Sequence, residues 1–406
     1  MIMADPNLKT DFLIVGGGPV GLMLAIGLAQ AGRKVVLVER FKPTETSDGT
    51  PYEVKNSFDG RVLALSHSSK VALEKLDLWS SLDAYVTDIE HVHVSQKGYL
   101  GITKLHAEEA NVPALGYSIQ SSDLGHVLWQ KANEQANITF LCPATLGNFV
   151  QSDTSVVADI AVEGQIVQVE SSIVIGADGT DSKVRQILDL TLEEKSYDAY
   201  GVIAQIETEQ HPGGWSFERF TEDGPVALLP MDGHFHKAVM VCPADKVESI
   251  KQLNDAEFIE RFADKMGERL GRFISVSPRM AYPLKETYVS QMVSGRAILM
   301  GNASHTQHPV AAQGLNLGIR DIDQFLAYFR TQDGDVHLNN LDFLTKYAAV
   351  RKQDHEKVMG LTDSLIQVFE HTSPVVGHLR GIGLMAMQGL PMLRKRFTRF
   401  AMGGSQ

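Results

Sequence analysis

Short apolar runs bounded by glycines predict buried strands near the start of the chain. Residues 12–15 and 35–38 are two such runs, and a longer apolar stretch, 22–30, lies between them. Runs of four residues suit strands, whereas a stretch of nine suits a helix, so a strand–turn–helix–strand unit is predicted. Because strands joined through one helix lie parallel, the chain is expected to contain a parallel sheet.

Strand-rich blocks interrupt these α/β elements further along the chain. Alternating positions predict strands over 89–105 and 197–243, several short strands over 138–175, and one more buried strand at 297–300. Helices are expected at 67–82, 119–136, 255–271, 314–330 and over much of 340–400. The pattern predicts two interleaved domains, an α/β domain of residues 1–86, 112–190 and 280–340 and a β-rich domain of residues 87–111 and 191–279. A helical C-terminal segment, 341–406, follows.

Composition and charge narrow the class of protein. The chain has 406 residues, 44% of them hydrophobic, and a net charge of −12, which argues against nucleic acid as a partner. The N-terminus lacks a signal peptide pattern, and no apolar run reaches the roughly 18 residues of a membrane span, so a cytoplasmic protein is expected. Cys142 and Cys242 are too few for a disulfide framework or a metal cluster, and no metal site is predicted.

The C-terminal tail differs from the rest in charge. Residues 371–406 carry five basic side chains and no acidic one, which leaves 32 basic and 49 acidic groups before them. Apolar residues in the tail repeat at spacings of three or four, namely Leu379, Ile382, Ala386, Leu390, Leu393, Phe397 and Phe400. A pair of amphipathic helices split at Pro391 is predicted. Either the apolar stripe packs on the main body, or the pair contacts anionic lipid at the inner face of the membrane or an acidic partner of a biosynthetic complex.

The turn between the first strand and helix has the glycine spacing of a dinucleotide site. Gly16, Gly18 and Gly21 allow the backbone to approach a pyrophosphate, whose charge the helix N-terminus favours. Glu39 ends the second strand, where an acidic side chain can bind a ribose hydroxyl. A dinucleotide is therefore expected, although this unit does not choose between NAD and FAD. The alternative is a tight turn without a ligand.

Two later loops also follow buried strands. Asp178 lies in a Gly-Ala-Asp-Gly loop after the run 172–175, and taken alone this loop could be an ordinary turn before a capped helix. Residues 301–321 follow the strand at 297–300, and their helix could direct its N-terminus at an anion such as reduced flavin.

Together these loops, in this order and spacing, resemble the para-hydroxybenzoate-hydroxylase-type (group A) flavoprotein monooxygenases. The stretch HPVAAQGLNLGIRD (308–321) is similar to the signature of the ubiquinone-biosynthesis hydroxylase branch. DGRVLALS (59–66) and HVHVSQKGYLG (91–101) are most similar to the 2-polyprenyl-6-methoxyphenol hydroxylases of that branch. The resemblance covers residues 11 to about 400. It implies an α/β fold in which a Rossmann-like FAD-binding domain is interleaved with a β-rich substrate domain and followed by a helical C-terminal tail.

The resemblance also implies roles for single residues. Gly16, Gly18 and Gly21 would hold the FAD pyrophosphate, Glu39 the adenosine ribose, and Arg61 the phosphates or the ribityl chain. The loop of Asp178 would serve both FAD and the reductant. Asn302 stands where most relatives have Asp, whose carboxylate binds a ribityl hydroxyl, and an amide oxygen can still accept that bond.

Residues 301–321 form the third loop and the start of its helix. The first residues of this helix are the expected contact for the reduced flavin. They are Gln313, Gly314, Leu315 and Asn316, whose backbone N–H groups would stabilise the negative charge. Ala312 stands where the branch usually has Gly, and Ala disfavours a positive φ there.

The resemblance implies the chemistry as well. NAD(P)H or another donor would reduce FAD, O2 would add at C4a, and the C4a-hydroperoxyflavin would transfer oxygen to a polyprenylated phenol. A base for the phenol is not identified by the sequence. His305 and His308 are the candidates, the alternative being loop histidines that bond to backbone. Trp215, Phe217 and Phe220 either line the substrate pocket or pack within a sheet.

Other classes of protein contain a similar dinucleotide-binding unit. A flavin-dependent tryptophan-type halogenase would need a W-x-W-x-I-P segment, but Trp79, Trp129 and Trp215 lie far apart. A prenyl carrier of the GDP-dissociation-inhibitor type would not need the loops of Asp178 and Asn302. An FAD hydroxylase of another ubiquinone ring position, or of a small soluble phenol, is the remaining alternative.

Overall fold

The computed structural model describes residues 7–41, 61–307, 313–330, 338, 340–370 and 373–403. It contains the predicted first unit as β1 (Asn7–Val15), α1 (Pro19–Gln30) and β2 (Val35–Val38). Side chains of β1 alternate between two cores, because successive residues of a strand point to opposite faces. Phe12 and Ile14 pack on the side of α1, whereas Leu13 and Val15 pack on the other side.

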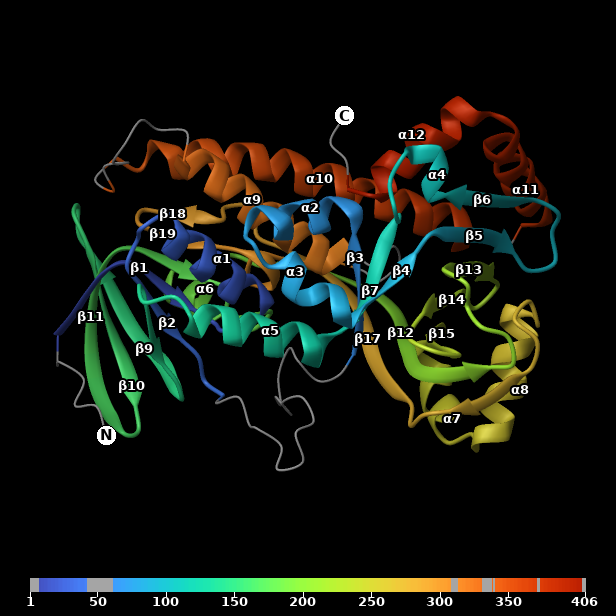
Figure 1. Cartoon of the computed structure of the whole chain (residues 1–406), viewed down its shortest axis with the longest axis horizontal. Coiled ribbons are helices and arrows are strands. Elements are labelled where there is room, and N and C mark those ends of the chain that lie inside the picture. The colour runs from blue at the N-terminus through green and yellow to red at the C-terminus, as the bar shows by residue number, and fades with distance from the viewer. Residues whose placement is uncertain are drawn as a thin grey trace.

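A parallel sheet surrounds this unit. Its strands follow the order β18-β19-β11-β1-β2-β8, and the five from β19 to β8 are parallel. Two antiparallel strands, β9 and β10, continue from β11 and cover one face (Figure 1). The bounds are β8 (Ile138–Leu141), β9 (Ala144–Gln151), β10 (Val156–Val162), β11 (Gln165–Gly176), β18 (Val293–Ser294) and β19 (Ala297–Leu299). The chain turns from β1 toward β2 on one side and reaches β11 on the other, so β1 and β11 flank the switch point where such sheets bind ligands.

Helices cover the opposite face of this sheet. Apolar side chains of α1 meet those of four further helices in one core. These helices are α2 (His67–Lys75), α5 (Ser121–Asn133), α9 (Gln313–Arg330) and α10 (Asp342–Glu370), with the short α3 (Trp79–Leu82) and η1 (Asp83–Tyr85) beside α2. α6 (Lys183–Ile187) packs against β9 and β11 in the core on the other face.

A second, nine-stranded sheet stands beside the first (Figure 1). Its order is β20-β17-β12-β15-β14-β13-β5-β6, with β16 paired to β12. The strands are β5 (His91–Gln96), β6 (Ile102–His106), β12 (Glu193–Thr208), β13 (Trp215–Thr221), β14 (Gly224–Pro230), β15 (Phe235–Pro243), β16 (Phe273–Val276), β17 (Met280–Tyr288) and β20 (His305–Thr306). One face packs against α7 (Val247–Lys251) and α8 (Asp255–Met266), which follow η2 (Ala244–Lys246).

Smaller elements join the two sheets. A three-stranded sheet of β3 (Val62–Ser66), β4 (Val86–Ile89) and β7 (Gly116–Gln120) lies between them (Figure 1). The C-terminal α11 (Pro374–Gly389) and α12 (Pro391–Ala401) pack against the β5–β6 hairpin and the short α4 (Ala107–Ala110). The predicted split of the tail at Pro391 is therefore present.

The predicted fold class is confirmed, since an α/β unit with a parallel sheet is interleaved with a β-rich unit and followed by helices. The structure differs from the predicted domain boundaries within residues 280–340. β17 and β20 fall in this range, which was predicted to belong to the α/β domain, yet β17 pairs with β12 and β20 pairs with β17. A strand belongs to the sheet of its hydrogen-bonding partner, and the partner is not visible in the strand's own residues.

Candidate active site

The three loops predicted to act together meet at one edge of the parallel sheet. They follow β1, β11 and β19, which are neighbours in the sheet, and Glu39 follows β2 on the far side of β1. The carboxyl ends of parallel strands lie at the same edge, so the fold brings these four segments together.

The glycine turn is held by close packing against the second loop. Gly16 has a φ of +111°, and a Cβ on it would lie 2.3 Å from the Ala177 carbonyl oxygen. A Cβ on Gly21 would lie 1.9 Å from the Gly16 carbonyl oxygen. Gly18 is the N-cap of α1 and makes no side-chain cap. The first-turn N–H groups of α1 therefore lack an intrahelical acceptor and suit an anion.

Glu39 is buried beside this turn. One carboxylate oxygen accepts a hydrogen bond of 2.6 Å from the Gly17 N–H, and the other accepts one of 2.8 Å from the Phe41 N–H. The acid at the end of β2 thus lies at the predicted position, next to the glycines.

Asp178 caps the short helix that follows its loop. Its Oδ2 accepts hydrogen bonds from the N–H groups of Lys183 (2.6 Å) and Val184 (3.3 Å). Its Oδ1 is buried and has no hydrogen-bond partner in the part of the chain that the structure describes. Burial raises the pKa of this carboxyl, and its hydrogen bonds only partly offset that effect. One oxygen therefore remains for a further donor.

The third loop packs closely against the start of α1. Gly301 has a φ of +57°, and Cβ atoms placed on Gly301 or on Gly318 would each lie 2.9 Å from Val20 Cγ2. Asn302, in the short η3 (Gly301–Ala303), is exposed. α9 begins at Gln313, and beyond the adjoining backbone no atom of the described residues lies within 4 Å of where a Cβ on Gly314 would stand.

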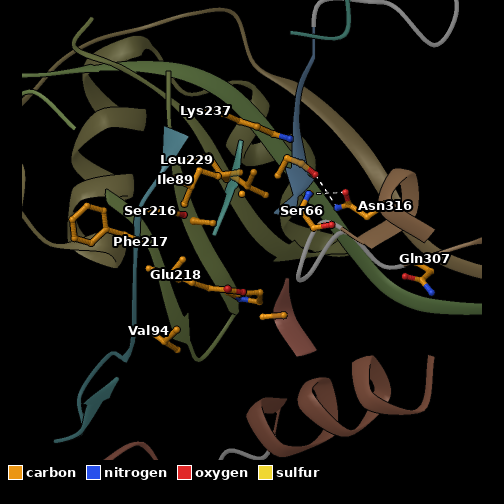
Figure 2. Close-up of a pocket in the computed structure, with 18 of the residues that line it drawn as sticks. Ser66, Ile89, Val94, Ser216, Phe217, Glu218, Leu229, Lys237, Gln307 and Asn316 are labelled. Carbon is orange, nitrogen blue, oxygen red and sulfur yellow. Dashed lines mark hydrogen bonds between the residues drawn. The ribbon is translucent and has the colours of Figure 1, made fainter. Parts of the chain in front are cut away.

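Asn316 has a role that the sequence did not indicate. Its Oδ1 accepts hydrogen bonds from the Ser66 N–H (2.8 Å) and the Ser69 hydroxyl (2.7 Å), and its Nδ2 donates to the Ala64 carbonyl (2.9 Å). The side chain therefore ties the first turn of α9 to β3 and α2 (Figure 2).

His305 is buried in a charged network behind the third loop. Its Nδ1 lies 3.1 Å from the Gly301 carbonyl oxygen and its Nε2 lies 3.2 Å from Asp321 Oδ2. Asp321 Oδ1 is 2.7 Å from Arg351 Nε and 2.8 Å from His355 Nε2. Burial and the adjacent His355 lower the pKa of His305 to about 3, so the ring is neutral. Burial would raise the pKa of Asp321, but His355 and Arg351 outweigh it and lower that pKa.

This network lies outside the cavity described below. His305, Asp321 and His355 are close enough together to suit a metal ion, but Arg351 already places a positive charge against Asp321. The other candidate base, His308, and the departure at Ala312 lie outside the described residues.

A cavity of about 690 Å³ lies against the second sheet. Its wall includes Asn316 and Gln307 near the third loop, the face of the nine-stranded sheet opposite α7 and α8, and parts of α11 and α12 (Figure 2). The residues of α11 and α12 that line it are Leu384, Met387, Phe397, Thr398 and Ala401. Phe217 and Phe220, two of the predicted pocket aromatics, also line it. Trp215 packs its ring against His91 at 4.7 Å.

Few charged groups reach this cavity. Arg61 stacks on the Tyr282 ring at 5.2 Å, Lys237 donates to the Val62 carbonyl, and Lys285 pairs with Glu194 at 3.1 Å. Glu218 is the one carboxyl group among the described residues that line the cavity.

Two residues that line the cavity were not predicted from the sequence. Gln307 has both amide atoms buried without a partner among the described residues. Glu218 sits between the predicted aromatics Phe217 and Phe220, and strand alternation places it on the same face as Phe220. Strand alternation alone could have placed Glu218 on the face of Phe220. A polar residue in an antiparallel strand normally lies on the solvent side, however, so the sequence did not distinguish Glu218 from a surface residue.

The residues at the loop edge fit FAD. Asp178 Oδ1 and the Gln307 amide are buried polar atoms that need partners. Positions beside Gly179 and Gly314 are open, because no described atom beyond the adjoining backbone lies within 4 Å of a Cβ placed there. Open backbone at a helix N-terminus and uncommitted polar atoms are what a bound dinucleotide requires.

These features define a dinucleotide-binding flavoprotein, and the chain belongs to the FAD binding domain family, whose model matches residues 9–328. The chain is 28% identical to the 3-demethoxyubiquinol 3-hydroxylase of Escherichia coli, over 98% of this chain and 99% of that protein. It is 29% identical to a ubiquinone hydroxylase of Rhodospirillum rubrum, over 97% of this chain and 89% of that protein. The resemblance to ubiquinone-biosynthesis hydroxylases and the prediction of FAD are thereby confirmed.

Solved structures share the fold. The p-nitrophenol 4-monooxygenase of Pseudomonas putida superposes with a TM-score of 0.77 at 16% identity, covering 98% of this chain and 99% of that chain. At this identity the likeness establishes the architecture alone.

Proposed function

We propose that this chain is an FAD-dependent monooxygenase that hydroxylates a polyprenylated phenol in ubiquinone biosynthesis, with NAD(P)H as reductant. The observation that carries the proposal is the 690 Å³ cavity, which is apolar along the sheet and reaches the third loop at one side and α11–α12 at another. Its size lies within the range of small-molecule sites. An aromatic head beside the third loop and an isoprenoid tail toward the C-terminal helices would match these surroundings.

The chain's own residues would hold FAD along the loop edge. The N–H groups at the start of α1 would bind the pyrophosphate, Glu39 the adenosine ribose, and Arg61 the phosphates or ribityl chain. Asp178 and Asn302 would accept hydrogen bonds from the ribityl hydroxyls or the reductant. The N–H groups of Gln313, Gly314, Leu315 and Asn316 would face the negative edge of the reduced ring. When bound and reduced, FAD supplies an activated oxygen atom from O2.

The protein then has to orient the phenol and keep water away from the reacting atoms. The apolar rows of the second sheet exclude water on one side, and α11 and α12 close the cavity on another. The Asn316 tether fixes the start of α9 against β3, so the N–H groups of its first turn keep their position.

The position at which the substrate ring is hydroxylated stays a prediction. The motifs at 59–66 and 91–101 favour 2-polyprenyl-6-methoxyphenol, whereas the Escherichia coli relative is named for the hydroxylation of 3-demethoxyubiquinol. Product analysis with each of the two rings would decide between them.

Contact with the membrane surface is the second part of the proposal. No helix in the described ranges combines the length and apolar character needed to cross a bilayer. Apolar side chains nevertheless lie exposed on α11 and α12, including Leu379 (61%), Ile382 (55%) and Met392 (87%). Leu100, at the tip of the neighbouring β5–β6 hairpin, is 83% exposed. Lys395 and Arg399 are exposed on α12, so an apolar surface with adjacent cations suits an anionic bilayer that delivers the substrate.

The function can be tested with purified protein. We expect a yellow protein with about one FAD per chain that oxidises NAD(P)H and forms a hydroxylated product from a prenylated phenol in detergent. Product formation from a short-chain phenol alone would favour the alternative of a small soluble substrate. A colourless protein that does not take up added FAD would refute the proposal.

A further inference from the structure

Glu218 interrupts an apolar row on the cavity side of the second sheet. Strand pairing aligns it with Val94 of β5 on one side and with Ala227 of β14 on the other. The row continues through Val239 of β15 to Ile203 of β12. All five side chains line the cavity, and the carboxyl group is the one polar member of the row. Figure 2 shows Glu218 and Val94 of this row.

Within the described ranges, which include every strand beside it, no hydrogen bond or ion pair satisfies the Glu218 carboxyl. The three cations that line the same cavity are engaged elsewhere, as described for Arg61, Lys237 and Lys285. The hydroxyls of Ser216 and Thr103 donate to the backbone carbonyls of Leu228 and Leu384. The Glu218 carboxyl is therefore an acceptor that receives no hydrogen bond from the described residues.

The surroundings of Glu218 also bring the pKa of its carboxyl close to neutral pH. Burial raises the pKa of Glu218 to about 7, because no neighbouring charge offsets the loss of water. The other ionisable groups that line the cavity are Arg61, Lys237, Lys285 and Tyr282. α11 and α12 present Leu384, Met387, Phe397, Thr398 and Ala401, so none of their basic side chains lines it. At neutral pH both forms of Glu218 are populated, which suits a general base.

We propose that Glu218 binds the phenolic hydroxyl of the substrate ring and accepts its proton. This inference rests on the proposed function. The O–H bond of the phenol breaks, its proton forms an O–H bond on Glu218, and the electron pair stays on the phenolate oxygen. Delocalisation of that pair raises electron density at the ortho and para carbons, where the ring takes up oxygen. The transfer needs no oxidant, and the apolar row holds the ring plane on either side of the carboxyl.

The test compares Glu218→Gln with Glu222→Gln, a control that changes an exposed carboxyl in the turn after β13. Two probes are titrated into each FAD-loaded protein, a prenylated phenol and its methyl ether, which has no hydroxyl proton. Glu218→Gln is expected to weaken binding of the phenol about tenfold or more and to leave the methyl ether unchanged, since a charged acceptor is lost. Equal affinity of wild type and Glu218→Gln for the phenol would overturn the inference.

Turnover gives the second readout. Wild-type kcat/KM for the phenol should fall as pH decreases below about 7, where Glu218 becomes protonated. In Glu218→Gln the rate should fall about 100-fold or more, and this acidic limb should vanish. Glu218→Asp should retain the limb at a lower rate, and FAD content verifies that each variant is folded.

The two proposals fail in different ways. A wild-type protein that hydroxylates no prenylated phenol refutes the proposed function, while the binding comparison still decides the role of Glu218. A wild type that hydroxylates the phenol, with a Glu218→Gln variant that keeps its rate and acidic limb, refutes the role of Glu218 alone.

Discussion

Asp321 shows how single residues hold the third loop in place. The carboxylate contacts Arg351 and both histidines of the network, and His305 contacts the Gly301 carbonyl in turn. A chain of contacts therefore runs from α10 through α9 to the loop predicted to bind FAD. A buried charge of this kind is costly unless its partners are present.

Replacing Asp321 by Asn should lower the free energy of unfolding by about 3 kcal/mol, because Arg351 loses one of its two carboxylate partners. Urea unfolding of the FAD-loaded protein measures this loss. Asp323→Asn is the control on the same helix, where a pair with Lys75 at the surface should contribute under about 1 kcal/mol. Equal losses for the two variants would contradict a structural role for the network.

At the scale of elements, α11 forms part of the cavity wall because two glycines let it approach the β5–β6 hairpin. A Cβ on Gly381 would lie 2.1 Å from the Leu100 carbonyl oxygen, and one on Gly377 would lie 2.2 Å from the Tyr99 ring. The helix thereby presents Leu384 and Met387 to the cavity while Leu379 and Met385 remain exposed. The predicted apolar stripe did not include Leu384 or Met387. Its α11 members are exposed, and Phe397 of α12 is the member that lines the cavity among the described residues.

Met387→Trp should fill part of the cavity at its helical side. We expect KM for a long-tailed phenol to rise about tenfold, because the tail loses room, while kcat with a short-tailed phenol is kept. Met385→Trp, two positions away and 48% exposed, is the matched control and should leave both constants unchanged. Steady-state kinetics with both substrates measures the difference, and an equal effect on long and short tails would argue against a tail path along α11.

At the scale of the whole molecule, charge is separated between the body and the tail. The first 370 residues carry a net charge of −17, whereas the tail carries +5. An anionic bilayer would attract the face with α11 and α12 and repel the rest, which would direct the cavity's helical side toward the lipid.

We expect the protein to float with anionic vesicles and less with neutral ones. A double variant, Lys395→Gln with Arg399→Gln, should bind anionic vesicles about 30-fold more weakly, since each basic residue near such a surface contributes about 1 kcal/mol. Lys34→Gln, exposed just before β2, is the charge control.

For the apolar surface, Leu379→Ser is compared with Ile166→Ser, a position on β11 with the same 61% exposure. Equal flotation of variant and control would refute the membrane surface.

The sequence by itself determined the parallel sheet, the glycine turn, the acid after β2 and the helical tail split at Pro391. These features depend on local patterns, in which apolar runs, glycines and a proline act on the chain within a few residues. The sequence also determined that three loops belong to one site, because all three follow buried strands.

Tertiary structure decided which side chains face one another. The pairing of β17 with β12, the tether from Asn316 to Ser66 and the burial of His305 against Asp321 join positions that are far apart along the chain. Glu218 gave no local sign of its role, because a carboxyl group in a strand is ordinary until its face is known to be covered. Only the packing of α11 and α12 over that face turned an expected surface residue into a half-buried acceptor that lines a cavity.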